Sequence, residues 1–215
     1  MKTPDDYSIS MAYSYKSSQE LATYYDDSAG GYDDYAVSVR YILPRLVAEK
    51  ASKYCRKSDK VIDVGCGTGL LGVEMNLIED ELVLHGVDVS QQMISHAYRK
   101  KRENGKRHYE KFFLSDMSNI ETMQKNNYDL MVSSGTFTTG HLNGKDLLVM
   151  LGLMKNDSFA IFSVKSDHFE ESKFLEDINN LKIKKLVEII DVSEVDSYEN
   201  DGYTAFSKIV SIKIN

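Results

Sequence analysis

One aspartate followed by three evenly spaced glycines marks the segment VIDVGCGTGLLG, residues 61–72. Asp63 interrupts an apolar run that has the length of a short buried strand. The glycines come at every second position after it, at Gly65, Gly67 and Gly69. Glycine adopts backbone dihedrals that other residues avoid and lets a ligand approach the main chain. A helix after such a turn offers free N–H groups, so the segment is a candidate ligand-binding turn.

Two common kinds of glycine-rich turn compete for this segment. A Walker phosphate loop ends in Gly-Lys-Ser or Gly-Lys-Thr, and the absence of lysine here excludes it. A dinucleotide turn has the pattern G-x-G-x-x-G with an acidic residue about 20 positions further on. Gly67, Gly69 and Gly72 fit that pattern, and Asp88 stands at the expected distance. The dinucleotide alternative therefore stays open.

The carboxylate of Asp63 favours a third kind of ligand, a cationic nucleoside. A carboxylate inside an apolar strand is unfavourable unless it has partners. It would repel the pyrophosphate of a dinucleotide. S-adenosylmethionine carries an ammonium and a sulfonium group, and Coulomb attraction favours both near a buried carboxylate. We therefore predict S-adenosylmethionine as the cofactor and S-adenosylhomocysteine as its product.

Asp88 and Asp116 extend this prediction, because each stands at or near the end of a further predicted strand. Ligands of parallel sheets bind beyond the carboxyl ends of the strands. We expect Asp63 to face the amino-acid end of the cofactor, directly or through water, and Asp88 to accept hydrogen bonds from both ribose hydroxyls. Asp116 would accept from the adenine amino group, and the backbone N–H of Met117 would meet a ring nitrogen.

Strands and helices alternate along the chain and position these residues. Apolar spacing predicts a helix from Tyr35 to Val47 that Pro44 kinks or restarts. The predicted strands are 61–64, 82–88, 111–116, 129–134 and 158–164, and the other predicted helices are 70–78, one capped by Ser90, 147–154 and 169–181. Two strand-like segments, 183–192 and 204–214, suggest an antiparallel pair at one sheet edge.

This alternation predicts an α/β fold, a Rossmann-like doubly wound, mostly parallel sheet with a C-terminal antiparallel hairpin. We expect a flexible N-terminal segment over residues 1–23 and one domain over residues 24–215. The 215 residues contain 42% hydrophobic and 27% charged residues, which is ordinary for a globular protein.

The charge and the cysteines bear on partners and location. The formal net charge of -7 and the lack of a basic stripe argue against nucleic acid. Cys55 and Cys66 have no disulfide spacing, there is no signal-like N-terminus, and no run approaches the ~18 apolar residues of a membrane span. We expect a soluble, cytoplasmic protein that does not bind membranes and is a monomer or a homodimer.

Three segments together resemble the class I S-adenosylmethionine-dependent methyltransferases, from about Tyr24 to the end of the chain. VIDVGCGTG resembles the first motif of that family, GVDVSQQMISHA the segment around its ribose aspartate, and FFLSDM its adenine motif. A narrower resemblance, carried by YDDSAGGYDDY, SSGTFTTGHL and DHFEESKF, is to the Williams–Beuren syndrome-region methyltransferase-like proteins.

The resemblance implies a seven-stranded sheet and an N-terminal tyrosine, Tyr25 or Tyr32, that closes over the methionine end. Gly30 and Gly31 replace a pair that is usually helical, so this lid is expected to be looser. Ser133, Ser134 and Gly135 are expected to line the methionine pocket through backbone groups. The residues expected to bind the cofactor are Tyr25, Tyr32, Asp63, Gly65, Cys66, Gly67, Thr68, Gly69, Asp88, Val89, Met93, Asp116, Met117, Ser133, Ser134 and Gly135.

Methyl transfer from a sulfonium mainly requires alignment of the acceptor and exclusion of water. A base is needed only if the acceptor loses a proton. His141, after the fourth strand, is the best candidate base, and a loop histidine that caps the next helix is an equal alternative. His168 is a weaker candidate. No metal is expected because the histidines lack ligand spacing, and Cys66 is expected to be a small filler rather than a nucleophile.

The predicted function is methyl transfer from S-adenosylmethionine to a small molecule. The acidic charge and the lack of an Asp/Asn-Pro-Pro-Tyr/Phe motif favour a small acceptor over nucleic acid. Two alternatives stay open: a protein that senses the cofactor without transferring methyl groups, and a nicotinamide-dependent oxidoreductase, which Asp63 disfavours.

Overall fold

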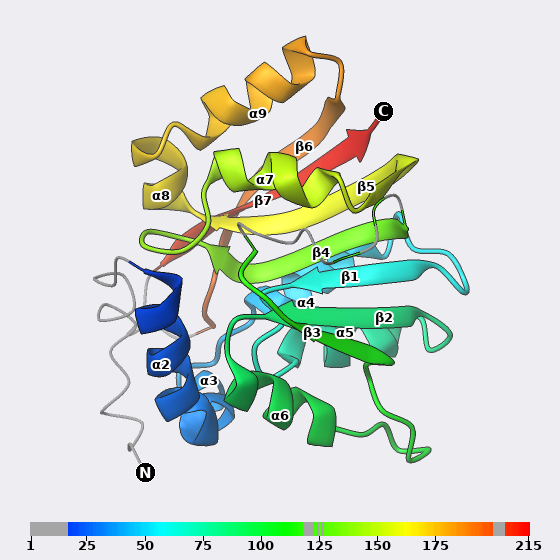
Figure 1. Ribbon diagram of the computed structural model, residues 1–215, viewed down its shortest axis with the longest axis vertical. Coiled ribbons are helices and arrows are strands. Elements are labelled where there is room, and N and C mark those ends of the chain that lie inside the picture. The colour runs from blue at the N-terminus through cyan, green and yellow to red at the C-terminus, as the bar shows by residue number, and fades with distance from the viewer. Residues whose placement is uncertain (1–16, 118–122, 124, 126, 200–204) are drawn as a thin grey trace.

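A seven-stranded sheet forms the centre of the computed structural model, which describes residues 17–117, 123, 125, 127–199 and 205–215. The strand order is β3-β2-β1-β4-β5-β7-β6, and β7 alone runs in the direction opposite to the other strands of the sheet (Figure 1). The strands are β1 (Lys60–Val64), β2 (Val83–Asp88), β3 (Lys111–Leu114), β4 (Tyr128–Phe137), β5 (Met154–Lys165), β6 (Val187–Asp196) and β7 (Phe206–Ile214). The expected Rossmann-like sheet with a C-terminal antiparallel hairpin is confirmed.

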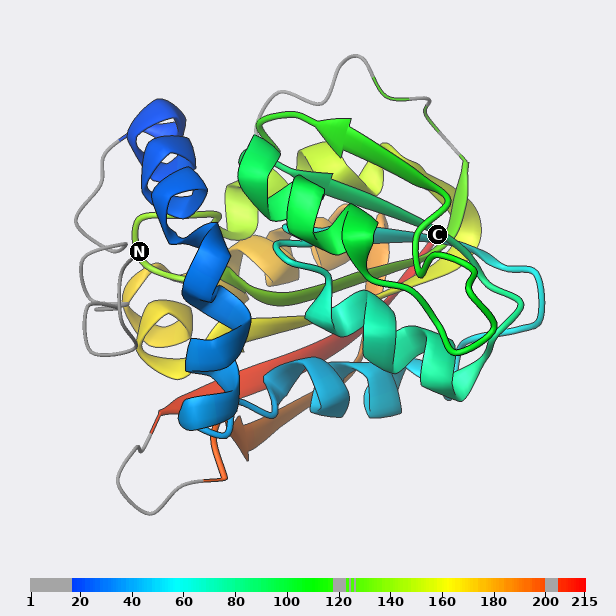
Figure 2. The same cartoon turned by 90° about the horizontal axis from the view of Figure 1, so that it is seen from below.

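Helices cover both faces of this sheet (Figures 1 and 2). They are α2 (Ser18–Ser28), the 3-10 turn η2 (Ala29–Gly31), α3 (Tyr32–Ser38), α4 (Leu43–Ala51), α5 (Leu70–Ile78), α6 (Gln91–Arg99), α7 (Gly144–Leu151), α8 (Ser166–Glu171) and α9 (Phe174–Ile183). Within the described ranges, no helix combines the length and the apolar character that a membrane crossing requires.

Side-chain alternation along the central strands produces two hydrophobic clusters. On β1, Val61 packs in the cluster that includes α4, α5 and α6, whereas Ile62 packs in the cluster that includes α7 and α9. Neighbouring strand residues point to opposite faces, and a sheet that is buried on both faces has near-continuous apolar strands. The apolar run around Asp63 therefore reflects its central place in the sheet.

Several predicted boundaries move for local reasons. The predicted helix 147–154 ends at Leu151, and Met154 already begins β5. The predicted helix 169–181 is divided into α8 and α9, because Lys173 has a left-handed φ of 57° between them. The predicted helix 35–47 is interrupted between α3 and α4. Pro44 lies in the first turn of α4, where it restarts the helix.

The N-terminal helix α2 begins earlier than the predicted domain boundary, which falls inside it between residues 23 and 24. Ser17 caps α2, because its side chain accepts a hydrogen bond from the backbone N–H of Glu20. Leu21 and Tyr24 form part of the buried face. Residues 1–16 of the expected flexible segment, and Thr204 of the last predicted strand, lie outside the described residues.

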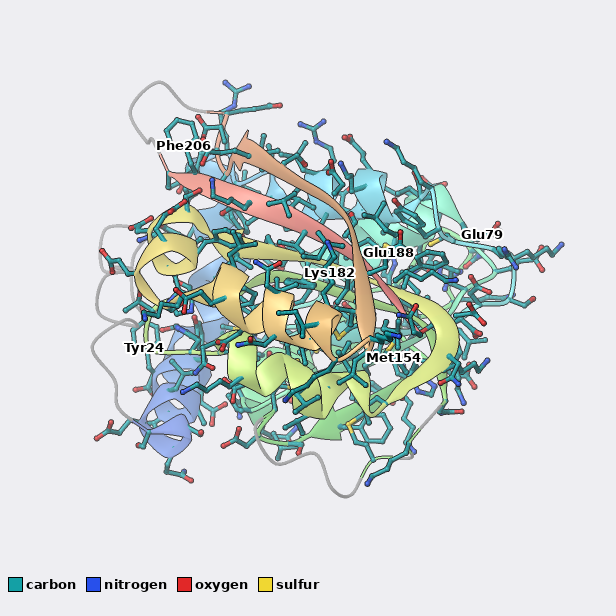
Figure 3. The ribbon with its side chains drawn as sticks, turned by 90° about the horizontal axis from the view of Figure 1, so that it is seen from above. Tyr24, Glu79, Met154, Lys182, Glu188 and Phe206 are labelled. Atoms are coloured by element: carbon teal, nitrogen blue, oxygen red, sulfur yellow. The ribbon has the colours of Figure 1, made fainter. Side chains whose placement is uncertain are left out.

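The helices α2 and α3 lie at the end of the sheet away from the C-terminus, where the parallel strands end (Figure 1). Tyr24 and Phe206 lie toward this same end of the molecule, and Met154 and Glu79 lie toward the other (Figure 3). The strand order reverses beside β1, which has β2 on one side and β4 on the other. Ligands of such sheets bind outside the strand ends at this switch point.

Gly72 in α5 tests how closely this region is packed. A Cβ atom there would lie 2.3 Å from the hydroxyl oxygen of the buried Tyr109. We expect Gly72→Ala to lower the free energy of unfolding by about 1–3 kcal/mol in urea titrations, because overpacking outweighs the helix propensity of alanine. Gly30→Ala is the control, because a Cβ at Gly30 meets nothing within 4 Å. A stabilising effect of Gly72→Ala would contradict the described packing.

Candidate active site

A cavity at the carboxyl ends of β1, β2 and β4 brings most of the predicted ligand-binding residues together; we call it the cofactor cavity. It contains about 950 Å³ of empty space, part of it open to solvent, which is within the usual range of ligand pockets. Its predicted lining residues are Tyr25, Tyr32, Gly65, Gly67, Asp88, Val89, Met93, Asp116, Met117, Ser134, Gly135 and His141. The lining residues that were not predicted are Ser17, Ser18, Leu21, Thr136, Gly140 and Leu142.

The glycine turn opens its backbone toward this cavity. Gly65, Gly67 and Gly69 have positive φ values of 68°, 52° and 86°, which other residues adopt only with strain. A Cβ added at Gly67 would meet nothing within 4 Å. The backbone N–H groups of Gly65 and Cys66 both donate to the carbonyl of Val87, at 2.9 and 3.0 Å. The turn is thus attached to β2 while its middle faces open space.

The carboxylate of Asp88 lies in the wall of the cofactor cavity. Its Oδ2 accepts from the backbone N–H of Gly67 at 2.8 Å, and its Oδ1 accepts from that of Ser90 at 2.9 Å. Burial raises the pKa of Asp88, and these backbone hydrogen bonds act in the opposite direction. Each carboxylate oxygen can accept more than one hydrogen bond, so Asp88 can also receive two adjacent ligand hydroxyls.

The structure corrects the place expected for Asp63. This side chain is fully buried and does not line the cofactor cavity. Its Oδ2 accepts from the hydroxyl of Tyr109 at 2.6 Å, and its Oδ1 has no hydrogen-bond partner among the described residues. Burial raises the pKa of Asp63 to about 7. The carboxyl therefore faces Tyr109. This residue is remote in sequence, and no sequence pattern predicted the contact.

Three further predicted residues also lie outside the cavity wall and have packing roles. Cys66 is buried in the hydrophobic cluster of α4 and α5, as its expected filler role requires, and burial raises the pKa of its thiol. Gly69 precedes α5, and a Cβ there would lie 3.0 Å from side-chain atoms of Ala97 and Tyr109. Ser133 donates from its hydroxyl to the carbonyl of Val64 at 2.7 Å. These contacts shape the turn without touching the cavity.

Thr68, also predicted to bind the cofactor, instead anchors the N-terminal helices. Its hydroxyl donates to Asp33 of α3 at 2.6 Å. Lys100 bonds to Asp33 at 2.5 Å and to the carbonyl of Thr68 at 2.6 Å. This network joins α3 to the glycine turn.

A second aspartate anchors α2. Asp26 accepts from the Ser90 hydroxyl at 2.6 Å and from the Gln92 backbone N–H at 2.9 Å, both at the N-terminus of α6. The Gly30–Gly31 pair lies in the 3-10 turn η2 between α2 and α3. The N-terminal lid was expected to be looser. Instead, both of its helices, α2 and α3, are hydrogen-bonded to the elements around the glycine turn and α6.

His141 lies in the wall of the cofactor cavity and contacts Tyr25 from α2. Its Nε2 is 2.9 Å from the hydroxyl of Tyr25, and its Nδ1 is 3.2 Å from the carbonyl of Thr139. A carbonyl only accepts, so Nδ1 carries the proton of the neutral ring and Nε2 accepts from Tyr25. Burial lowers the pKa of His141, which favours this neutral ring.

Two polar groups in the region add to the chemistry of the wall. The hydroxyl of Ser134 is buried and, within the described part of the chain, has no hydrogen-bond partner. Buried polar groups in proteins are nearly always paired, so this hydroxyl is a candidate ligand contact. His168, the weaker candidate base, does not line the cofactor cavity, and its Nε2 lies 3.1 Å from the carbonyl of the lining residue Leu142.

The sequence does contain a helix signal for Ser17, Ser18 and Leu21, the cavity-lining residues at α2 that were not predicted. Ser17 and Glu20 have the spacing of a helix-capping pair, and Leu21, Tyr24 and Ser28 follow at helical spacing as the buried residues of α2. Thr136, Gly140 and Leu142 lie in the segment after the predicted fourth strand, which β4 extends to Phe137.

Asp63 gives a test of the buried network. The unfolded carboxyl has a pKa near 4 and the folded one about 7, so ionisation of Asp63 destabilises the folded state as the pH rises through this interval. We expect the stability of the natural chain relative to Asp63→Asn to fall by at most about 4 kcal/mol between pH 4 and pH 8. Urea titrations at several pH values measure this difference. A pH-independent difference between the natural chain and Asp63→Asn would contradict the assignment.

A methyltransferase domain family model matches residues 56–199. The chain is 34% identical over 85 residues to the carboxy-S-adenosyl-L-methionine synthase of Campylobacter curvus, and the match covers 34% of this chain and 36% of that protein. The chain thus spans about a third of the length of this curated relative.

Solved structures show a similar fold. The magnesium protoporphyrin IX methyltransferase of Synechocystis superposes with a TM-score of 0.66 at 16% identity, over 92% of this chain and 97% of that one. A TehB-like methyltransferase of Corynebacterium glutamicum gives a TM-score of 0.64 at 16% identity, over 90% and 99% of the two chains. Because the family model covers most of the chain and the fold agrees with it, this chain belongs to the methyltransferase domain family.

Proposed function

We propose that the chain transfers a methyl group from S-adenosylmethionine to a small-molecule acceptor. One observation carries the proposal: the carboxylate of Asp88 lines a cavity beside the open backbone of Gly67. A ribose offers two adjacent hydroxyls to such a carboxylate. The solved methyltransferase of Synechocystis, which shares the fold, contains bound S-adenosylmethionine, and this supports the choice of cofactor.

The remaining wall residues fit the other parts of this cofactor. Asp116 and Met117 line the cavity beyond β3 and would hold the adenine. Tyr25, Tyr32, Ser134 and Gly135 line it from α2, α3 and β4, and they would surround the methionine end. The buried hydroxyl of Ser134 would gain a hydrogen-bond partner there. When bound, S-adenosylmethionine supplies an electrophilic methyl group.

The chain itself contributes alignment, exclusion of water and a proton acceptor. The helix α2 covers the cavity through Leu21 and Tyr25, which limits access of water to the reacting atoms. Nε2 of His141 accepts from the hydroxyl of Tyr25. An acceptor proton can therefore pass to Tyr25 while the Tyr25 proton passes to His141. In this proposal His141 acts as the base through Tyr25 and does not contact the acceptor directly.

The acceptor is proposed to be small because a second cavity of limited size adjoins the cofactor cavity. It shares Tyr25, Tyr32 and Gly135 with the cofactor cavity. The net charge of -7 gives no attraction for nucleic acid. Membership in the narrower group resembling the Williams–Beuren syndrome-region proteins remains part of this proposal.

Cofactor binding is the first test. We expect S-adenosylhomocysteine to raise the melting temperature of the chain and NAD to leave it unchanged. Asp88→Ala should weaken the S-adenosylhomocysteine affinity about 10- to 100-fold in isothermal titration calorimetry, because hydrogen bonds to a charged group contribute about 1.5–3 kcal/mol. Asp80→Ala, an exposed aspartate before the other end of β2, is the control. Equal stabilisation by NAD, or unchanged affinity in Asp88→Ala, would reject the proposal.

The pH dependence of methyl transfer is the second test, with labelled S-adenosylmethionine and a metabolite extract as the source of acceptor. Burial lowers the pKa of His141, so the neutral ring persists to pH values below the ordinary histidine pKa of about 6.5. We expect the rate to be constant from pH 7 to 8 and to fall only at pH values below about 6.5. His141→Asn should lower the rate about 100-fold or more and remove this fall.

An unchanged profile in His141→Asn would contradict the proton-acceptor role alone. The absence of any labelled product, together with tight binding of the cofactor, would instead favour a sensor that does not transfer methyl groups.

A further inference from the structure

A cavity lined by six tyrosines adjoins the cofactor cavity; we call it the tyrosine cavity. It contains about 850 Å³ of empty space, part of it open to solvent, between the N-terminal helices and the ends of β4, β5 and β7. Its tyrosines come from α2, α3 and the segments after α3 and β6, and they are Tyr24, Tyr25, Tyr32, Tyr35, Tyr41 and Tyr198.

The tyrosine rings form a preassembled wall. Tyr24 and Tyr25 pack edge to face with ring centroids 5.3 Å apart, and Tyr41 and Tyr198 pack with centroids 5.4 Å apart. The backbone of Tyr41 also pairs with that of Tyr198, which ties the end of α3 to the end of β6. Aromatic side chains bind other flat rings by offset or edge-to-face packing, so the wall suits a planar, ring-containing molecule.

The charge of the tyrosine cavity is one-sided. Lys165, at the end of β5, is the one cationic side chain among its described lining residues, and none of those residues is acidic. The Nζ of Lys165 lies 2.7 Å from the carboxylate of Asp167. An ammonium has three N–H donors and can bond to more than one oxygen at a time. A ligand anion would be attracted to Lys165, whereas a ligand amine would find no carboxylate among the described lining residues.

A buried hydroxyl in the same wall is a further candidate ligand contact. Thr138 is 5% exposed, and its hydroxyl has no hydrogen-bond partner in the described part of the chain. It lies in the same lining as Phe137, just before the loop that carries His141. Since a buried hydroxyl without a partner is unfavourable, a polar ligand group beside Thr138 would stabilise the complex.

The place of Tyr25 connects this cavity to the proposed chemistry. Tyr25 lines both cavities and bonds to His141 through its hydroxyl. A molecule in the tyrosine cavity would thus meet the cofactor and the proton acceptor at one point. We propose that the tyrosine cavity binds the methyl acceptor, and that this acceptor is a small aromatic carboxylate whose ring packs on the tyrosines and whose acid group pairs with Lys165. This inference rests on the proposed function.

Binding of two matched probes to the full-length chain tests the inference. The chain is saturated with S-adenosylhomocysteine, and 4-hydroxybenzoate and 4-hydroxybenzylamine are titrated separately by calorimetry. The probes share the phenol ring and carry opposite charges. We expect 4-hydroxybenzoate to bind at least tenfold more tightly than the amine. Lys165→Met should weaken the binding of 4-hydroxybenzoate at least tenfold and leave the affinity for S-adenosylhomocysteine unchanged.

Lys213→Met is the matched control. Lys213 pairs with Asp157 at 2.6 Å, much as Lys165 pairs with Asp167, but outside the tyrosine cavity. Its substitution should leave the binding of 4-hydroxybenzoate unchanged. Tighter binding of the amine, no binding of 4-hydroxybenzoate, or equal affinities in the natural chain and Lys165→Met would each overturn the inference about the acceptor. Failure of S-adenosylhomocysteine itself to bind would instead overturn the proposed function.

Discussion

A buried chain of hydrogen bonds from Asp63 through Tyr109 to Gly72 holds the site together. The hydroxyl of Tyr109 donates to Asp63 on β1 and accepts from the backbone N–H of Gly72 on α5. Such bonds are strong in a low dielectric, and removal of one member leaves a buried group unpaired. The chain fixes the strand before the glycine turn relative to the helix after it. The position of Gly67 and its bond to Asp88 depend on this frame.

The N-terminal helices are attached to the same frame by two further carboxylates. Asp33 bonds to Thr68 in the glycine turn, and Asp26 bonds to Ser90 and Gln92 at the beginning of α6. Both contacts join elements that are distant in sequence but meet at the strand ends. The helices that supply most tyrosines of the tyrosine cavity are therefore positioned by the elements that carry Asp88.

Local patterns were sufficient to predict the sheet, because its strands are short apolar runs between clear helix signals. They also identified Asp88 and Gly67, together with Asp116 and Met117 after β3 and His141 after β4, but not Gly140 and Leu142. The place of Asp63 could not be predicted, because its partner Tyr109 lies before another strand and only the folded sheet brings the two together. The same reason applies to Thr68, whose hydroxyl donates to an aspartate of α3 that is remote in sequence. Local signals report periodicity and capping, whereas these contacts depend on tertiary packing.

The bond from Asp26 to the N-terminus of α6 has a kinetic consequence. Ser90 caps α6 with the same hydroxyl that donates to Asp26, and its backbone N–H holds Asp88. Outward movement of α2 would break the contacts of Asp26 with Ser90 and Gln92. Exchange of the nucleoside by such a movement would therefore release a side-chain contact of Ser90, the residue whose backbone N–H holds Asp88. Opening steps of this kind can set a turnover rate.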